Sequence, residues 1–283
     1  MISTHQTIID GLPQVYHVAG TGPVCVVHPG GPGIGWGYLR LPELEEHLTM
    51  VYVEPIGTGD SGRLPQARDY HLDTYLRFLE GVVAHLGQEK VFLLGHSHGG
   101  FVVQRYALAH PDRVAGLVLY DTSPVTGEQF WASAMEGVAV YPSEHPDQPA
   151  AEDVPKGFQA ALDAADDAAL TAAFARFIPL YLHDYWARRE EFAPFTAGLR
   201  AWADPQRGEE PEPFDVRTRL GEITAPALIV VGRHDFICGV RWAQMLHKGI
   251  PGSRLVVLEG SGHMGHIEQS GEFYRAVGEF LGR

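Results

Sequence analysis

The sequence has few cysteines, no long apolar run and no excess of basic residues, and each shortage excludes a class of protein. Cys25 and Cys238 are the two cysteines among 283 residues, and without a C-x-x-C pair they indicate neither a disulfide framework nor a zinc site. The formal net charge of −14 argues against nucleic acid, because phosphates require a basic surface. No apolar run approaches the roughly 18 residues of a membrane span, and residues 1–6 lack signal-peptide features. We therefore expect a cytoplasmic protein that binds neither nucleic acid nor a membrane.

Apolar strands alternate with amphipathic helices on both sides of a different middle segment. Strands are expected at residues 24–28, 50–53, 91–94, 114–120, 227–231 and 255–258, and helices at 39–48, 70–86, 100–107, 241–246 and 269–281. This alternation predicts an α/β fold whose mostly parallel sheet is flanked by helices. Residues 125–224 are rich in alanine, proline and aromatic residues and acidic overall, with helical stretches around 159–180. We expect them to form a helical cap inserted between two parts of one core, residues 1–124 and 225–283; its acidity fits either a solvated face or attraction of a substrate.

The most informative motif is GHSHG at residues 95–99, because an apolar strand precedes it and a helical pattern follows. A G-x-S-x-G motif between strand and helix is typical of a nucleophile elbow, in which glycines permit a sharp turn that exposes the serine. The helix after the serine favours negative charge at its N-terminus. Ser97 is therefore the candidate nucleophile.

A serine nucleophile requires a base, and the base requires an orienting acid. Asp235 and His263 each follow an expected late strand, in the chain order Ser, Asp, His that this arrangement uses. Asp235 could otherwise cap a helix, and His263 could be a turn residue. His266 is a competing base, otherwise expected at an outward position on the next helix, and Asp121 is a competing acid because it also ends a strand.

The remaining histidines and a second serine motif have simpler interpretations. His96, His98 and His234 flank the candidate residues and are expected to line the pocket. The 15 histidines show no H-E-x-x-H or comparable ligand spacing, so no metal site is expected. The GDSG sequence at residues 59–62 imitates a protease serine motif, but no all-β context accompanies it, and we interpret it as a structural turn.

An acyl-transfer intermediate needs two donors for its oxyanion. The His98 amide, at the start of the helix after Ser97, is one candidate. The other is expected from the loop HPGGPG at residues 28–33, where glycines permit close approach and prolines add rigidity. A tight loop without a ligand and a phosphate-binding loop are the alternatives, the latter disfavoured because neither G-K-[ST] nor G-x-G-x-x-G is present.

These motifs, together with the turn EPIGTGDS at residues 54–61, resemble the α/β-hydrolase superfamily and, more narrowly, its proline iminopeptidase-like branch. The resemblance covers nearly the whole chain. It implies that Ser97 is the nucleophile, Asp235 the orienting acid and His263 the base. Gly31 and His98 would then be the oxyanion donors, with Gly30 as the substitute for Gly31.

Several residues depart from that branch. Pro29 separates His28 from the double glycine, so the H-G-G-P-G signature is partly kept, and the turn at Ile56 lacks the branch's arginine. Phe236 stands where some members place an acid that holds a substrate amine. An amine anchor would have to come from the cap, where the acidic candidates are Glu136, Glu190 and Glu191. Serine rather than aspartate at position 97 argues against epoxide hydrolases and haloalkane dehalogenases.

We therefore predict a serine hydrolase with an acyl-enzyme intermediate that cleaves a small amide or an N-terminal prolyl peptide. The main alternative is a carboxylesterase or lactonase acting on a small ester. A cofactor-free lyase or peroxidase and a non-catalytic small-molecule sensor are further alternatives. The chemistry requires no metal or organic cofactor, the expected partner is a small molecule or short peptide, and the oligomeric state is left open.

Overall fold

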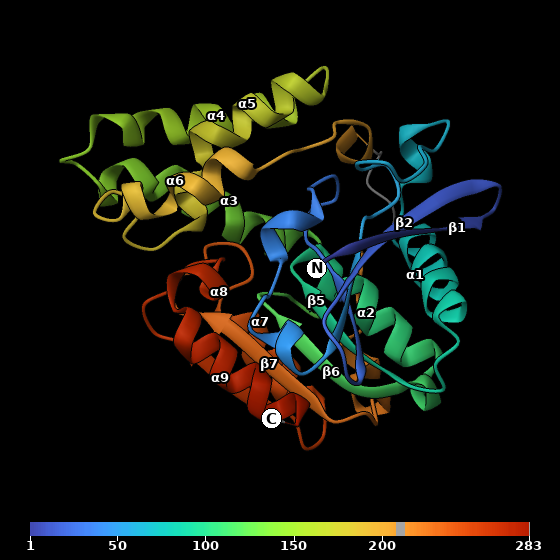
Figure 1. Cartoon of the computed structure of the whole chain (residues 1–283). Coiled ribbons are helices and arrows are strands. Elements are labelled where there is room, and N and C mark those ends of the chain that lie inside the picture. Colours follow the sequence, from blue (N-terminus) through green and yellow to red (C-terminus); the bar gives the residue numbers. More distant parts are fainter. Residues whose placement is uncertain (208–212, 283) are drawn as a thin grey trace.

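An eight-stranded sheet runs through the molecule in the order β1-β2-β4-β3-β5-β6-β7-β8 (Figure 1). The computed structural model describes residues 1–207 and 213–282. The strands are β1 Ser3–Ile9, β2 Leu12–Ala19, β3 Val24–His28, β4 Thr49–Val53, β5 Val91–His96, β6 Val114–Tyr120, β7 Ala227–Gly232 and β8 Arg254–Leu258. From β4 to β8 every pairing is parallel, whereas β1–β2 and β2–β4 are antiparallel. The predicted mostly parallel sheet is confirmed.

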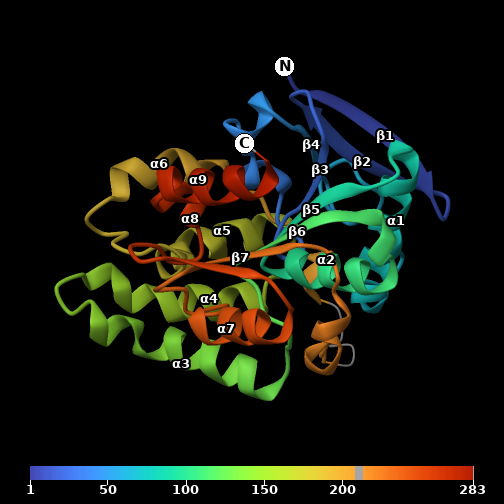
Figure 2. The same ribbon diagram turned by 90° about the horizontal axis from the view of Figure 1, so that it is seen from below.

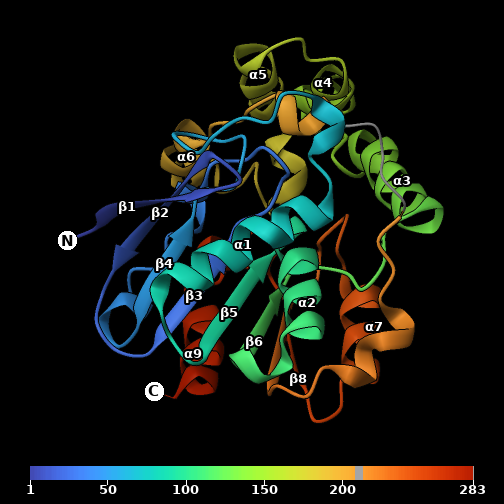
Figure 3. The ribbon, with the colours of Figure 1, turned by 90° about the vertical axis from the view of Figure 1, so that its right-hand side faces the viewer.

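Helices cover both faces of this sheet, and a hydrophobic cluster fills each interface. The core helices are α1 Leu72–Leu86, α2 His98–Ala109, α7 Val240–Gly249, α8 Gly265–Glu268 and α9 Ser270–Leu281. Figures 2 and 3 show α1, α2 and α7 on one face and α9 on the other. Phe78, Val102 and Trp242 bury their side chains in the first cluster, and Phe273 and Val277 in the second. None of the helices in the described ranges is long and apolar enough to cross a bilayer.

The segment between β6 and β7 forms a helical insert above the carboxyl ends of the strands (Figures 1 and 3). Its helices are α3 Glu128–Glu144, α4 Val154–Leu162, α5 Asp167–Phe177 and α6 Arg189–Gly198. The insert has hydrophobic clusters of its own, one of them around Val154, Phe158 and Phe177. We use "cap" for this insert; its limits at 125 and 224 remain predictions, and its residues 208–212 lie outside the described residues.

Two expected helices differ from the structure, and both differences have local causes. In place of a helix at residues 39–48, the chain forms the short 3₁₀ turns Trp36–Leu39 and Leu44–Glu46. The stretch between them contains Pro42, which lacks the amide that a continuous helix requires. The helical stretch expected at 159–180 is divided into α4 and α5, because the Asp166 side chain accepts the Ala169 amide and begins a new helix.

Candidate active site

Ser97 occupies a strained turn between β5 and α2. Its φ and ψ are 52° and −121°, a region that residues with a side chain rarely adopt. Gly95 and Gly99 make the turn possible, because a Cβ atom on Gly99 would lie 2.1 Å from the His28 carbonyl oxygen and one on Gly95 would lie 2.5 Å from the Gly99 carbonyl oxygen. The Ser97 amide donates to the Tyr120 carbonyl over 3.0 Å. These contacts give the sharp strand-to-helix turn that the motif predicts.

His263 and Asp235 meet at the carboxyl ends of β7 and β8. The His263 Nδ1–H group donates to Asp235 Oδ2 over 2.8 Å, and both side chains are buried. Asp235 Oδ1 accepts the amides of Ile237 and Cys238 over 2.9 and 3.0 Å. With Nδ1 committed to the carboxylate, the Nε2 atom of His263 is the one left for chemistry.

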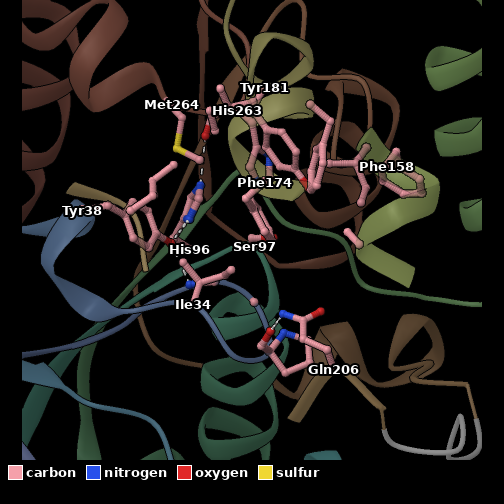
Figure 4. Close-up of a pocket in the computed structure, with 18 of the residues that line it drawn as sticks. Ile34, Tyr38, His96, Ser97, Phe158, Phe174, Tyr181, Gln206, His263 and Met264 are labelled. Atoms are coloured by element: carbon pink, nitrogen blue, oxygen red, sulfur yellow. Dashed lines mark hydrogen bonds between the residues drawn. The ribbon is translucent and has the colours of Figure 1, made fainter. Parts of the chain in front are cut away.

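Ser97 and His263 both line the same cavity (Figure 4). Within the described residues, no hydrogen bond joins Ser97 Oγ to His263, and the Ser97 side chain lies beside the buried Cys238 thiol instead. Such serine–histidine contacts are often loose in a free enzyme and tighten when substrate binds. The structure thus brings the three predicted residues into one site, with the hydrogen bond between His263 and Asp235 already formed.

Tyr38 connects the glycine-rich loop to the elbow and to the His263 loop. Its hydroxyl accepts the Gly30 amide over 2.7 Å and donates to His96 Nδ1 over 2.6 Å. His96 Nε2–H in turn donates to the His263 carbonyl over 3.0 Å. Burial holds the pKa of His96 well below its usual range, so the ring stays neutral. Each hydrogen bond in the series from Gly30 to the His263 carbonyl therefore keeps the same donor and acceptor.

The Gly31 amide is the better placed of the two candidate loop donors. Gly30 donates its amide to Tyr38, whereas the Gly31 amide has no acceptor in the described part of the chain. Gly31 lines the cavity and has φ +131°, a conformation that favours glycine. His98 is the first residue of α2, where helix amides lack carbonyl partners from a preceding turn.

Replacing Tyr38 with phenylalanine should lower kcat about tenfold, because Gly30 and His96 each lose a buried partner, at a cost of roughly 1–3 kcal/mol per group. Tyr52→Phe is the matched control, since its buried hydroxyl also bridges two groups, the Leu41 amide and Glu45, but Tyr52 does not line the cavity. Ester turnover and thermal unfolding should be measured for both variants. Equal losses of kcat would show that the Tyr38 bridge has no special role.

Glu268 secures the loop that carries His263. Its carboxylate accepts the amides of Gly262 and Met264, on either side of His263, over 2.9 and 3.1 Å, and that of His183 from the cap over 2.5 Å. The His263 amide also donates to the cap, to the Tyr181 carbonyl over 2.8 Å. Burial raises the pKa of Glu268 to about 7, although the three amides oppose the rise. The position of His263 therefore depends on the cap as well as on the core.

The two competitors for base and acid have other partners. His266 was expected on an outward helix face, which is wrong: it is 5% exposed, and its nitrogens contact the Tyr120 hydroxyl and the Tyr38 carbonyl, both over 2.9 Å. Burial lowers its pKa to about 4. Asp121 accepts the Gly232 amide over 2.8 Å, and His263 pairs with Asp235 instead.

Of the three histidines expected to line the pocket, His96 does so. His98 lies outside the lining and packs edge-on against Tyr75, with ring centroids 4.8 Å apart. His234 is exposed and stacks on His183 of the cap at 3.7 Å. For these two the prediction is wrong, because their backbone positions direct the rings to an adjoining helix and to the cap.

Ser61 is part of a structural turn, as its GDSG motif was interpreted. The side chain is 5% exposed, donates to the Glu54 carbonyl over 2.6 Å and accepts the Val15 amide over 3.0 Å. The Glu54 carboxylate accepts the amides of Asp60 and Ser61. These bonds fix the loop beside β2 and leave the hydroxyl buried.

Two groups of potential metal-ligating atoms adjoin the elbow, and both share His263. They are His96, Asp121 and His263, and Asp235, Cys238 and His263, with the ligating atoms of each group within 4.8 Å of one another. Both nitrogens of His96 are hydrogen-bonded, and the Asp235 oxygens bind His263 and two amides. Because a metal would have to break these bonds, we assign no metal to either group.

The cavity has a volume of about 210 Å³ and is lined almost entirely by uncharged side chains. Figure 4 shows Phe158, Phe174 and Tyr181 of the cap facing Tyr38, His96 and Ser97 of the core. The lining residues are Gly30, Gly31, Pro32, Ile34, Tyr38, His96, Ser97, Trp131, Phe158, Ala161, Leu162, Phe174, Phe177, Ile178, Tyr181, Leu199, Gln206, Ile237, His263 and Met264. Among the described residues, no aspartate, glutamate, lysine or arginine belongs to this lining.

The candidate amine anchors lie elsewhere. Glu136 on α3 and Glu190 on α6 are exposed and do not line the cavity. Glu191 pairs with Arg188 over 2.6 Å. Phe236, in the position where some iminopeptidase-like proteins have an acid, packs against Tyr181 with ring centroids 5.0 Å apart.

Tyr38 and Glu268 are the site residues that the sequence did not indicate. Neither lies in a recognised motif, and each acts through backbone groups that come close in the folded chain. The apolar cap side chains Phe158 and Phe174 follow helical spacing, which predicts burial but does not distinguish a cap core from a cavity wall.

Comparison with known proteins gives one family across most of the chain. The family described as "alpha/beta hydrolase fold" matches residues 23–270. The chain is 28% identical to a proline iminopeptidase of Saccharolobus solfataricus, covering 95% of this chain and 87% of that protein. It is 30% identical to a 2-hydroxy-6-oxononadienedioate/2-hydroxy-6-oxononatrienedioate hydrolase of Klebsiella pneumoniae, covering 92% and 87%. The crystal structure of a hydrolase from Pseudomonas aeruginosa superposes with a TM-score of 0.75 at 25% identity, covering 100% and 98%.

Proposed function

This chain belongs to the α/β-hydrolase family, and from that premise we propose that it is a serine hydrolase acting on an uncharged carboxylic ester or lactone. Ser97 is the nucleophile, His263 the general base and Asp235 the acid that orients it. The absence of any acidic, lysine or arginine side chain from the described cavity lining is the observation that carries the substrate class. The proposal selects the ester alternative over the iminopeptidase prediction.

A charged substrate group would lose its hydration in this cavity without gaining an oppositely charged side chain from the described lining. Transfer of an unpaired ion into an apolar site costs several kcal/mol or more. The free amine of a prolyl peptide needs a carboxylate, and Glu136, Glu190 and Glu191 do not line the cavity. The dioate named for the Klebsiella relative would need cationic groups, and the described lining supplies none.

The apolar lining also favours an ester over an amide. An amide N–H buried without an acceptor costs roughly 1–3 kcal/mol. Phe158, Phe174 and Phe177 offer no acceptor to a substrate N–H, so an amide would depend on the few polar lining side chains, such as Gln206, whereas an ester has no N–H to satisfy. A small acyl or alkoxy group can instead gain about 25 cal/mol per Å² of apolar surface that it removes from water.

The geometry of the three residues supports the following catalytic steps. Ser97 Oγ attacks the ester carbonyl while its proton moves to Nε2 of His263, which is free because Nδ1 is held by Asp235. The amides of Gly31 and His98 receive the oxyanion. The alkoxide departs with the proton from His263, and a water molecule then repeats the sequence on the acyl-enzyme. No metal or organic cofactor takes part in these steps.

Arylboronic acids of matched size test the charge preference, because they form a tetrahedral adduct with a catalytic serine. Inhibition of p-nitrophenyl butyrate turnover should be measured with 4-methyl-, 4-carboxy- and 4-(aminomethyl)phenylboronic acid. We expect the neutral compound to bind at least about tenfold more tightly than either charged one, since the described lining offers neither charge an oppositely charged side chain. Tightest binding of the amine would support a prolyl peptide, and tightest binding of the carboxylate a dienoate substrate.

A further inference from the structure

Asp121 is a buried carboxyl group for which the mechanism above has no use. It follows β6, its side chain is 0% exposed, and φ at this residue is 42°. Its amide donates to the Val230 carbonyl over 2.9 Å, and its Oδ1 accepts the Gly232 amide over 2.8 Å. Because β6 and β7 are neighbouring parallel strands, their carboxyl ends place Asp121 beside the loop after β7 that carries Asp235.

The second oxygen of Asp121 has no conventional partner. Asp121 Oδ2 is inaccessible to solvent and has no hydrogen-bond partner in the described part of the chain. A carboxyl oxygen of Asp121 lies within 4.8 Å of a ring nitrogen of His263, the residue that Asp235 binds over 2.8 Å, so the two carboxyl groups are close neighbours in a buried site. Two ionised carboxylates at this separation would repel each other strongly in a dry site. A single shared proton removes the repulsion and gives Oδ2 its missing interaction.

The surrounding donors decide which of the two groups carries the proton. Asp235 accepts from His263 Nδ1 and from the amides of Ile237 and Cys238, and all three bonds favour the ionised form. Asp121 accepts from one amide, that of Gly232. We propose that Asp121 is a neutral carboxylic acid that donates a hydrogen bond to the Asp235 carboxylate and so positions the acid that orients His263.

The wider surroundings agree with a neutral Asp121. Burial, followed by the charge of Asp235, raises the pKa of the Asp121 carboxyl well above its usual range. Other titratable groups also face it from neighbouring elements: His96 on β5, His263 after β8, Glu268 on α8, Tyr38 and Tyr120, and Cys238 after β7. In the part of the chain that the structure describes, this set contains no lysine or arginine that would favour an ionised Asp121.

The role of Asp121 in turnover rests on the proposed function, so the test includes a readout that requires no substrate. Asp121→Asn keeps an oxygen for the Gly232 amide and supplies an N–H to Asp235, whereas Asp121→Ala removes both. Asp112→Asn, at an exposed position, is the control for loss of one carboxylate. All should be compared with the parent protein in ester turnover and thermal unfolding between pH 5 and pH 9.

We expect Asp121→Asn to keep kcat within about threefold of the parent at pH 7, and Asp121→Ala to lose at least about tenfold. At alkaline pH the parent should lose activity as Asp121 ionises against Asp235, and Asp121→Asn should lose less. Folding of the parent takes up a proton between the ordinary carboxyl pKa, about 4, and the raised one. Its unfolding constant should therefore rise more steeply with pH than that of Asp121→Asn, by up to tenfold per unit. Glu268 is present in both proteins, so its contribution to the pH dependence of unfolding cancels in this comparison.

Three results would overturn the inference. The first is a loss of activity in Asp121→Asn as large as in Asp121→Ala when both variants are folded, because an ionised carboxylate would then be needed. The second is an identical pH dependence of unfolding in the parent and Asp121→Asn. The third is failure of Asp121→Asn to fold, since asparagine can make each of the proposed hydrogen bonds. If Asp121→Ala does not fold, the pH dependence of unfolding in the parent and in Asp121→Asn decides the question. That comparison requires no substrate.

Discussion

Replacing Ser97 with alanine is expected to lower kcat by at least about 10⁴-fold while leaving the fold intact. In the proposed mechanism the Ser97 oxygen forms the acyl-enzyme, and loss of a serine nucleophile removes nearly all the catalysis that such a set of three residues provides together. The backbone bonds of Ser97, its amide to the Tyr120 carbonyl and its carbonyl to the Thr122 hydroxyl, do not involve the side chain. We therefore expect an unfolding temperature close to that of the parent protein.

Ser143→Ala is the control for this variant, because Ser143 is an exposed cap residue whose hydroxyl donates to the Val140 carbonyl. It should retain full turnover of p-nitrophenyl butyrate. A fluorophosphonate probe should label the parent protein and Ser143→Ala but not Ser97→Ala. If Ser97→Ala stayed active, the acyl-enzyme mechanism would be wrong.

The second large effect is expected for His263→Gln, which should lower kcat by roughly 10³- to 10⁴-fold. Glutamine can still donate to Asp235, but it cannot take up the Ser97 proton or return it to the leaving group. The loss should appear in kcat more than in KM, because the ring acts on bonds that change in the transition state. Steady-state kinetics with p-nitrophenyl butyrate measure both quantities.

His266→Gln separates the two candidate bases. Both of its ring nitrogens are occupied by Tyr120 and Tyr38, so we expect a loss of stability with less than about a tenfold loss of kcat. His234 is exposed and next to Asp235 in the sequence, and His234→Ala should change neither the stability nor kcat. A larger loss of kcat in folded His266→Gln than in His263→Gln would reverse the assignment of the base.

The sheet and the chain order of the candidate residues could be predicted because both depend on local signals. A short apolar strand followed by a glycine-rich turn marks the elbow at Ser97, and Asp235 and His263 follow later strands of the same kind. The hairpin of β1 and β2 was not predicted, since β1 is largely polar and its residues are mostly exposed. An edge strand of this type lacks the apolar pattern that identifies the central strands.

The parts of the site that escaped prediction depend on contacts between distant segments. Tyr38 reaches His96 across 58 positions of sequence, and Glu268 binds the His183 amide across 85. His266 follows His263 closely and carries no signal of its own, and its burial against Tyr120 and Tyr38 is fixed by tertiary packing. The described cavity lining, which contains no acidic, lysine or arginine side chain, is likewise assembled from the cap and the core, so no single motif indicates the proposed substrate class.

The most direct test of the account is turnover of three substrates by the parent protein and by Ser97→Ala: p-nitrophenyl butyrate, prolyl-p-nitroanilide and a 2-hydroxy-6-oxo-dienoate. We expect the parent to hydrolyse the neutral ester with a kcat/KM at least about 100-fold above that for either charged substrate, and Ser97→Ala to be inactive on all three. Preferred, Ser97-dependent cleavage of the prolyl anilide or the dienoate would contradict the uncharged-ester proposal. Ester hydrolysis by Ser97→Ala at the parental rate would contradict the mechanism itself.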